Sequence, residues 1–394
     1  MLKEKIIILL TGIAIATFGA WPTYHGNVSL SGISECELPE KPELLWRYNA
    51  GGEVYNTPVS DGERIYFSAK KGQVVALDLN GSNVWKKTFT RINDAGQEIA
   101  VRFEASLVCD EGFVFAGSTR GTLYALDAKT GAEKWKYETG GIIAASPNLI
   151  ESERNDAKAQ HEKRCSASAS SRLKYPAIVV LDQSAGALHC IDVLTGKLRW
   201  KSEEVERCDG APGVGVGRIV FGSCLAALHV YSLEGLHLKD IEVGGDGQIA
   251  GGVAVDGRQA FAGARAGGML CFDLEKGTVL WSSNESKEQT FSTPAVTDDR
   301  VVYSSNDGFV YAAHRTDGAL VWKFDTGGLP YSSIISADKV VVSADGILFL
   351  LNLTDGAKLW AKEISDDITS PAIIDGMVVV GTDDGTVTAF GSKK

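Results

Sequence analysis

The sequence predicts an all-β protein, an eight-bladed β-propeller in which each blade is a four-stranded antiparallel sheet. Three observations predict this fold: a Gly–Trp spacing that recurs along the chain, strand-like runs upstream of each copy, and complementary incomplete repeats at the two chain ends. Arg64-Ile-Tyr-Phe67 and Gln73-Val-Val-Ala-Leu77 are two such runs, dominated by apolar and β-branched residues. Units of about 40 residues with four short strands are typical of propeller blades.

The recurring spacing places a tryptophan four residues after a glycine. Short polar residues such as Asp78 and Asp127 precede the glycine, and they suit a hairpin turn because they cap it while glycine accepts a positive φ. The six copies are Gly81 and Trp85, Gly131 and Trp135, Gly196 and Trp200, Gly277 and Trp281, Gly318 and Trp322, and Gly356 and Trp360.

Two more positions complete the set of tryptophan strands. A degenerate copy keeps the hairpin up to Gly235 but has Lys239 where the tryptophan would fall, and Trp46 lies in a strand with no blade before it. The chain therefore has eight such positions, which predicts eight blades. The last copy stops at Phe390-Gly391 without its tryptophan strand, so residues 44–48 should complete the last blade and close the ring.

The beginning of the chain differs from the repeats. Residues 1–20 combine a basic start with an apolar run, which predicts a secretory signal peptide; an uncleaved membrane anchor is the alternative. We expect an extended segment over residues 21–43, the propeller over residues 44–391, and a periplasmic or secreted protein. The polar, Ser-rich stretch at about 151–175 predicts a flexible surface insert.

The chain is acidic, with a formal net charge of −11. This charge disfavours nucleic acid as a partner and docking on an anionic membrane, so membrane contact is expected only through a partner or an uncleaved signal. A closed ring needs no second subunit, so we expect a monomer.

Recognisable catalytic and metal-binding patterns are missing from the sequence. No histidine lies in a zinc or nucleophile–base spacing, and acidic turns such as Asp383-Asp-Gly385 lack the alternating oxygen ligands of a calcium loop. His189 and His229 occupy one strand position in consecutive blades, which is expected to be partly solvated; a shared metal site is the alternative. We therefore expect no catalytic residue and no metal ligand.

Seven cysteines in an exported protein suggest disulfides. Cys208 and Cys224 lie eight residues either side of a turn at Val216, so they should face each other across antiparallel strands and form a disulfide. Cys190 and Cys271 are expected to be small buried residues. The pairing of all cysteines except Cys208 and Cys224 stays open: Cys36, Cys109, Cys165, Cys190 and Cys271.

The repeats, the segment Trp21-Pro-Thr-Tyr-His-Gly-Asn27 and several Ser/Thr-Pro pairs resemble the pyrroloquinoline-quinone-like (PQQ-like) repeat propellers over nearly the whole chain beyond residue 20. The pairs are Thr57-Pro58, Ser146-Pro147, Thr293-Pro294 and Ser370-Pro371. That family includes PQQ-dependent dehydrogenases and the non-catalytic propeller of the outer-membrane assembly machinery, which is the nearer type. The dehydrogenases carry adjacent cysteines beside the quinone and carboxylates for Ca²⁺. This chain has no Cys-Cys pair, so PQQ and Ca²⁺ are expected only under a redox alternative. The assembly propeller is a lipoprotein, and no cysteine stands at the cleavage region here to carry a lipid.

A binding site is expected where the inner strands begin near the axis. The third residue before each Ser/Thr-Pro position forms a column there: Tyr55, Phe103, Ala144, Asp209, Ile249, Phe291, Tyr331 and Ile368. With Arg102, the aromatic and charged members predict a mouth for a peptide or small ligand, and packing between blades is the alternative.

The sequence thus predicts an exported, non-enzymatic scaffold that binds a protein or peptide, with cell-envelope assembly as its setting. A PQQ-dependent redox enzyme and a carbohydrate-binding propeller are the alternative functions.

Overall fold

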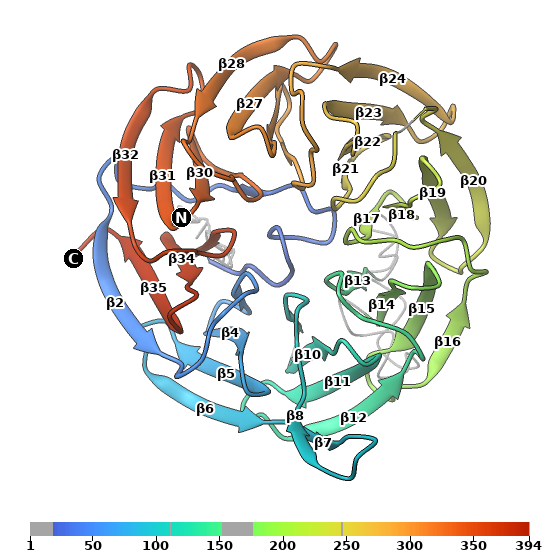
Figure 1. Ribbon diagram of the computed structural model, residues 1–394, viewed down its shortest axis with the longest axis vertical. Helices are drawn as coiled ribbons and strands as arrows, with labels where there is room; N and C mark the ends of the chain where they lie inside the picture. The colour runs from blue at the N-terminus through green and yellow to red at the C-terminus, as the bar shows by residue number, and fades with distance from the viewer. Residues whose placement is uncertain (1–18, 111, 152–175, 246, 394) are drawn as a thin grey trace, which may run out of the picture.

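The computed structural model describes residues 19–110, 112–151, 176–245 and 247–393. Eight sheets stand around one axis as a closed ring, with the first strand of each sheet near the axis and the last at the rim (Figure 1). The all-β, eight-bladed propeller is therefore confirmed. Most of the predicted signal peptide and the predicted insert lie outside the described residues, which contain no helix suited to crossing a membrane.

Seven blades each use four consecutive strands, written here from the axis outward, and the eighth takes its outer strand from the other end of the chain. The blades are β3 (Val59–Ser60), β4 (Arg64–Ala69), β5 (Gln73–Asp78) and β6 (Asn83–Thr88); β9 (Val108–Asp110), β10 (Phe113–Gly117), β11 (Thr122–Asp127) and β12 (Glu133–Glu138); β13 (Asn148–Ile150), β14 (Ala177–Asp182), β15 (Ala187–Asp192) and β16 (Leu198–Lys201); β17 (Gly213–Gly215), β18 (Arg218–Gly222), β19 (Ala227–Ser232) and β20 (His237–Glu242); β21 (Ala254–Asp256), β22 (Gln259–Gly263), β23 (Met269–Asp273) and β24 (Thr278–Ser283); β25 (Ala295–Val296), β26 (Arg300–Ser304), β27 (Phe309–His314) and β28 (Leu320–Asp325); β29 (Ile334–Ser336), β30 (Lys339–Ala344), β31 (Ile347–Asn352) and β32 (Lys358–Glu363); and β33 (Ala372–Ile374), β34 (Met377–Gly381), β35 (Thr386–Gly391) and β2 (Glu43–Asn49). Outside this pattern, β1 (Ile33–Ser34) adds a parallel strand to the seventh blade, and β7 (Thr90–Ile92) and β8 (Glu98–Ala100) form a separate hairpin.

The ring closes as the sequence predicts. Strand β2 pairs antiparallel with β35, with Trp46 opposite Ala389 and Arg47 opposite Thr388. The two ends of the chain therefore build one blade, and neither leaves an open sheet edge at the seam.

The residues of the repeated Gly–Trp spacing couple most blades to the next one. Trp85 of the first blade donates its indole N–H to the carbonyl of Ala128 in the second blade, at 2.9 Å. Its ring lies against Gly131, where a Cβ would come within 2.6 Å of Trp85 Cε3 and where φ is +68°. We call this pairing of an indole with the next blade's glycine a latch. The same latch joins Trp46 to Gly81, Trp135 to Gly196, Trp200 to Gly235, Trp281 to Gly318, and Trp322 to Gly356.

The degenerate fourth blade keeps part of the latch. The Lys239 ammonium donates a hydrogen bond of 2.7 Å to the carbonyl of Glu275 in the fifth blade, and the lysine side chain lies beside Gly277. The lysine therefore replaces the hydrogen bond of the indole but not the area that its ring covers.

The predicted extended segment forms a strap, residues 21–36, across one end of the axial channel, visible as the dark blue trace inside the ring (Figure 1). Its backbone carbonyls accept hydrogen bonds from inner strands that would otherwise lack partners near the axis. The acceptors and their donors are Trp21 with Ser60, Pro22 with Cys109, Val28 with Val214, Ser29 with Val255, Ser31 with Val296, and Gly32 with Ile335.

His25 of the strap predicts a pH-dependent stability. The imidazole is buried, with Nδ1 2.8 Å from the Leu30 carbonyl and Nε2 3.1 Å from the Ser333 carbonyl. Burial lowers the pKa of His25 to about 4, against the two carbonyls that favour the charged form. An unfolded chain would protonate this histidine near its ordinary value of 6.5. As the pH falls from about 6.5 to about 4, the unfolded chain takes up this proton first, so about 3 kcal/mol of stability should be lost over that window.

The measurement is urea unfolding at a series of pH values for the wild type and His25→Gln. Since other groups also titrate, the difference between the two pH profiles reports His25. If the unfolding free energies of the wild type and His25→Gln fell in parallel from pH 7 to pH 4, His25 would not be the cause of the acid-dependent loss of stability.

Candidate functional site

The mouth is the end of the channel at which the inner strands begin, opposite the strap. In the seventh blade, Tyr331 precedes β29, whose residue Ile335 then donates its N–H to the strap carbonyl of Gly32. The loops that enter the inner strands therefore surround the mouth, and they carry the column of residues predicted as a binding site.

Tyr55 and Tyr331 are the two column members that are most open to solvent, 50% and 41% exposed. They line one pocket of about 110 Å³ together with Asp367 and Asp383. The Tyr331 hydroxyl donates to Asp367 Oδ2 at 3.0 Å, and the Lys70 ammonium lies 5.5 Å from the centre of the Tyr55 ring. The structure thus brings two predicted residues together at a tyrosine-lined, acidic pocket.

The charge state of this pocket follows from its burial. Burial raises the pKa of the Asp367 carboxyl, and the neighbouring Asp383 carboxylate adds to the rise. Burial and Asp367 also raise the pKa of the Tyr331 hydroxyl to about 12, so it stays a neutral donor near pH 7. Aromatic faces with a few hydrogen-bonding groups suit contact with a peptide.

Ile368 also lines this pocket, but the other column residues and Arg102 do not. Phe103 is only 6% exposed and packs against Phe89 and Tyr124, with ring centres 5.8 and 5.9 Å apart, so it belongs to the packing between blades. The Asp209 carboxylate accepts hydrogen bonds from Gln183 Nε2 and, at 2.9 Å, from Arg207 Nε. Two apolar column members, Ile249 and Ile368, are buried, as the packing alternative expects.

Phe291 and Arg102 lie at the mouth face but at separate places. The Arg265 guanidinium covers Phe291 at 5.7 Å from its ring centre. Arg102 forms an ion pair with Glu104 at 2.7 Å and lines a different pocket of about 490 Å³ between the β7–β8 hairpin and the second blade. That pocket is cationic, and sequence reasoning missed its other basic residues because they come from three separate segments: Arg91, Arg120 and Lys136.

The predicted Cys208–Cys224 disulfide is not present, and both cysteines are free. The N–H of Cys224 donates to the carbonyl of Arg207 at 3.0 Å, so Arg207 and not Cys208 is its backbone neighbour. The Cys208 side chain is buried and its thiol lies 3.0 Å from the Glu206 carbonyl, whereas Cys224 is half-buried. The backbone pairing is therefore offset by one residue from the pairing that the sequence predicts.

Cys190 and Cys271 are buried as expected, and burial raises the pKa of both thiols to about 12. His189 and His229 have different partners: His189 Nδ1 lies 2.9 Å from the Tyr137 hydroxyl, and His229 Nδ1 lies 2.7 Å from Asp240. Both histidines are buried, whereas the sequence predicted a partly solvated position.

An eight-bladed ring held by indole latches, with an open mouth at one end of its axis, defines a β-propeller of the PQQ-like repeat class. A family model described as "Outer membrane protein assembly factor BamB" matches residues 38–141, 79–207 and 185–373. The chain belongs to this family.

Individual relatives are distant. The BamB of Bordetella pertussis is 23% identical over 301 residues, which cover 72% of this chain and 68% of that protein. The crystal structure of BamB from Moraxella catarrhalis superposes with a TM-score of 0.69 at 20% identity, covering 89% of this chain and 98% of that chain. The quinohemoprotein alcohol dehydrogenase of Comamonas testosteroni superposes with a TM-score of 0.74 at 13% identity, covering 95% of this chain and 81% of that chain. Similarity at these identities establishes the shared fold.

Proposed function

We propose that this chain is a periplasmic, non-enzymatic scaffold for outer-membrane protein assembly that holds a segment of a partner protein at its mouth. Membership of the assembly-factor family supports this setting. The observation that carries the site is the set of exposed apolar side chains on the loops and turns of the mouth face: Tyr55, Ile142, Leu225, Leu329 and Tyr331.

These side chains favour a protein partner over a small ligand. The tyrosine pocket, at about 110 Å³, is smaller than the roughly 300 Å³ at which pockets for small molecules and cofactors usually begin. A quinone such as PQQ, which the fold family's dehydrogenases use, therefore does not fit there. Exposed tyrosines and aliphatic groups spread around an opening are typical of contacts with another protein, where aromatic residues carry much of the affinity.

The test is photo-crosslinking in the periplasm with p-benzoylphenylalanine placed at Tyr55, Tyr331 or Val216. Val216 is a matched control because it is also exposed, at 58%, but lies in the turn after β17 at the strap end. We expect crosslinks to proteins of the outer-membrane assembly machinery from the two tyrosine positions and none from Val216.

Crosslinks from Val216 alone, or none from the tyrosine positions, would contradict a partner site at the mouth. Stoichiometric binding of PQQ with Ca²⁺ and reduction of a redox dye by the purified protein would overturn the non-enzymatic function. Binding to a glycan array that Tyr55→Ala and Tyr331→Ala abolish would favour the carbohydrate alternative.

A further inference from the structure

The fourth blade, the one without a tryptophan, carries a cluster of metal-ligating side chains on its two outer strands. His229 lies on β19, and His237 and Asp240 lie on β20, with His229 directly opposite Asp240 in the strand register. A β-bulge between Val230 and Tyr231 places His237 opposite Tyr231. Residues three apart in a regular strand point to opposite faces, so the bulge is what brings His237 and Asp240 to one face.

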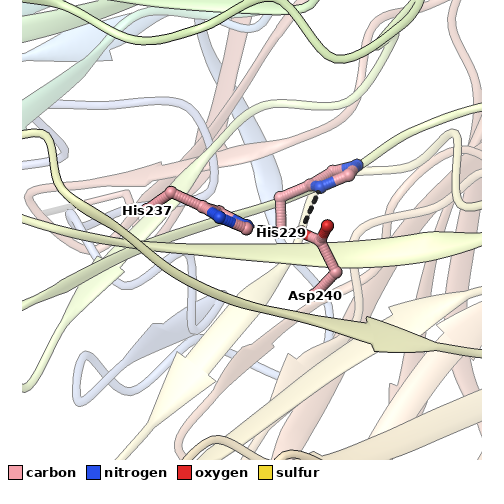
Figure 2. Close-up of side chains that lie close together, drawn as sticks. All are labelled: His229, His237 and Asp240. Carbon is pink, nitrogen blue, oxygen red and sulfur yellow. Dashed lines mark hydrogen bonds and ion pairs between the residues drawn. The ribbon is translucent and has the colours of Figure 1, made fainter.

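The three side chains converge on one point (Figure 2). His229 Nδ1 and His237 Nε2 lie 2.7 and 2.8 Å from the same oxygen, Oδ1 of Asp240. All three ligand atoms lie within 4.8 Å of one another. We propose that this cluster is a binding site for a divalent transition-metal ion of the zinc type.

The distances allow such an ion with little movement. Zinc binds imidazole nitrogen and carboxylate oxygen at about 2.0–2.2 Å, which puts tetrahedral ligand atoms roughly 3.4 Å apart. Asp240 is 43% exposed at the rim, so it can move outward by less than about 1 Å to open the present contacts to that spacing. His237 is also partly exposed, so the ion can enter from solvent and complete its coordination with water.

The buried histidine is held for this role from its far side. Ser223 Oγ lies 2.7 Å from His229 Nε2, and His229 is 1% exposed. When Ser223 accepts a hydrogen bond from Nε2–H, Nδ1 is left unprotonated and free to bind a metal. Metal-binding histidines usually have such a partner on the second ring nitrogen. The His237 ring is supported by Tyr231, with ring centres 5.1 Å apart.

The negative charge of Asp240 also distinguishes the fourth blade from the others. Asp240 follows the latch position Lys239, and the equivalent residue in five other blades is basic: Arg47, Lys86, Lys136, Lys201 and Lys323. The remaining two blades have Ser282 and Ala361 there. A carboxylate opposite a histidine therefore occurs only in the blade whose indole is replaced. A bound ion would tie the rim strand β20 to β19 within the one blade that lacks a tryptophan.

Imidazole with carboxylate selects Zn²⁺, Co²⁺, Ni²⁺ or Cu²⁺ over Ca²⁺ and Mg²⁺, which prefer all-oxygen sites. The experiment is a titration of the untagged, full-length protein with Zn²⁺ by calorimetry, repeated with Co²⁺ to record its visible absorption. We expect one ion per chain, a rise in Tm with Zn²⁺, and no competition from millimolar Mg²⁺.

Variants decide whether the cluster is the site. His237→Gln and Asp240→Asn should each weaken Zn²⁺ binding at least tenfold and abolish the rise in Tm. Both residues are partly exposed, so folding should survive, which the Tm without metal checks. His314→Gln, an exposed histidine on β27, is the control and should bind as the wild type does. No stoichiometric binding by the wild type, or equal binding by His237→Gln, would overturn the proposal and leave a cluster that is only hydrogen-bonded.

Discussion

Gly131→Ala should destabilise the protein by about 3 kcal/mol, a large effect for the addition of one methyl group. A residue other than glycine at φ +68° costs about 1–2 kcal/mol. The new Cβ would also overlap the Trp85 ring, at 2.6 Å from Cε3, and displace an indole whose N–H is bonded to Ala128 in the second blade. Overpacking of this kind adds about 1–3 kcal/mol. Urea unfolding followed by tryptophan fluorescence measures the change.

Gly217→Ala separates the two causes. Gly217 has φ +73° but nothing within 4 Å of its Cβ position, so it carries the backbone cost alone. We expect Gly217→Ala to lower the free energy of unfolding by about 1 kcal/mol. If Gly131→Ala and Gly217→Ala were equally destabilising, the contact with the neighbouring blade would contribute nothing, and the latch would be only a turn preference.

The latch shows how far the sequence predicts this fold. The spacing of Gly131 and Trp135 within one blade is visible in the sequence, and it correctly predicted the number of blades and the closure at Trp46. The spacing alone could not show that a glycine such as Gly131 contacts the tryptophan of the preceding blade, because that contact joins Gly131 to Trp85 across a sheet boundary.

The candidate sites were less predictable because they depend on details of register. A shift of one residue separates Cys208 from Cys224, and one bulge gathers His237 and Asp240 with His229. The shift has no signal in the sequence, whereas the bulge recurs at this position in all eight blades and belongs to the repeat. The repeat spacing alone does not show which side chains the bulge brings to one face. At the mouth, sequence reasoning found Tyr55 and Tyr331 but could not tell which column positions are exposed, since burial of Phe103 depends on contacts with residues distant in the sequence.

Trp21→Ala should cost about 4 kcal/mol, because it removes the anchor of the strap. The Trp21 side chain is 1% exposed and packs in a core cluster with Phe67 of the first blade and Phe390 of the last. Truncation of a buried tryptophan costs about 3–5 kcal/mol. The same residue exchanges two backbone hydrogen bonds of 2.9 Å with Ser60. Loss of the side chain should therefore loosen the strap, so protease cleavage near residue 25 should become faster in addition to the fall in the unfolding free energy.

Trp21→Phe is the matched control. The indole Nε1 of Trp21 is buried and has no hydrogen-bond partner in the part of the chain that the structure describes. Phenylalanine keeps most of the apolar area and removes an unsatisfied donor, whose burial costs about 1–3 kcal/mol. We expect the two effects nearly to cancel, with a change within about 1 kcal/mol and no faster cleavage. If Trp21→Phe were as damaging as Trp21→Ala, the indole N–H would have to be bonded in solution. If both variants were neutral, the strap would not be anchored by Trp21, and the inner strands would have to find their partners without it.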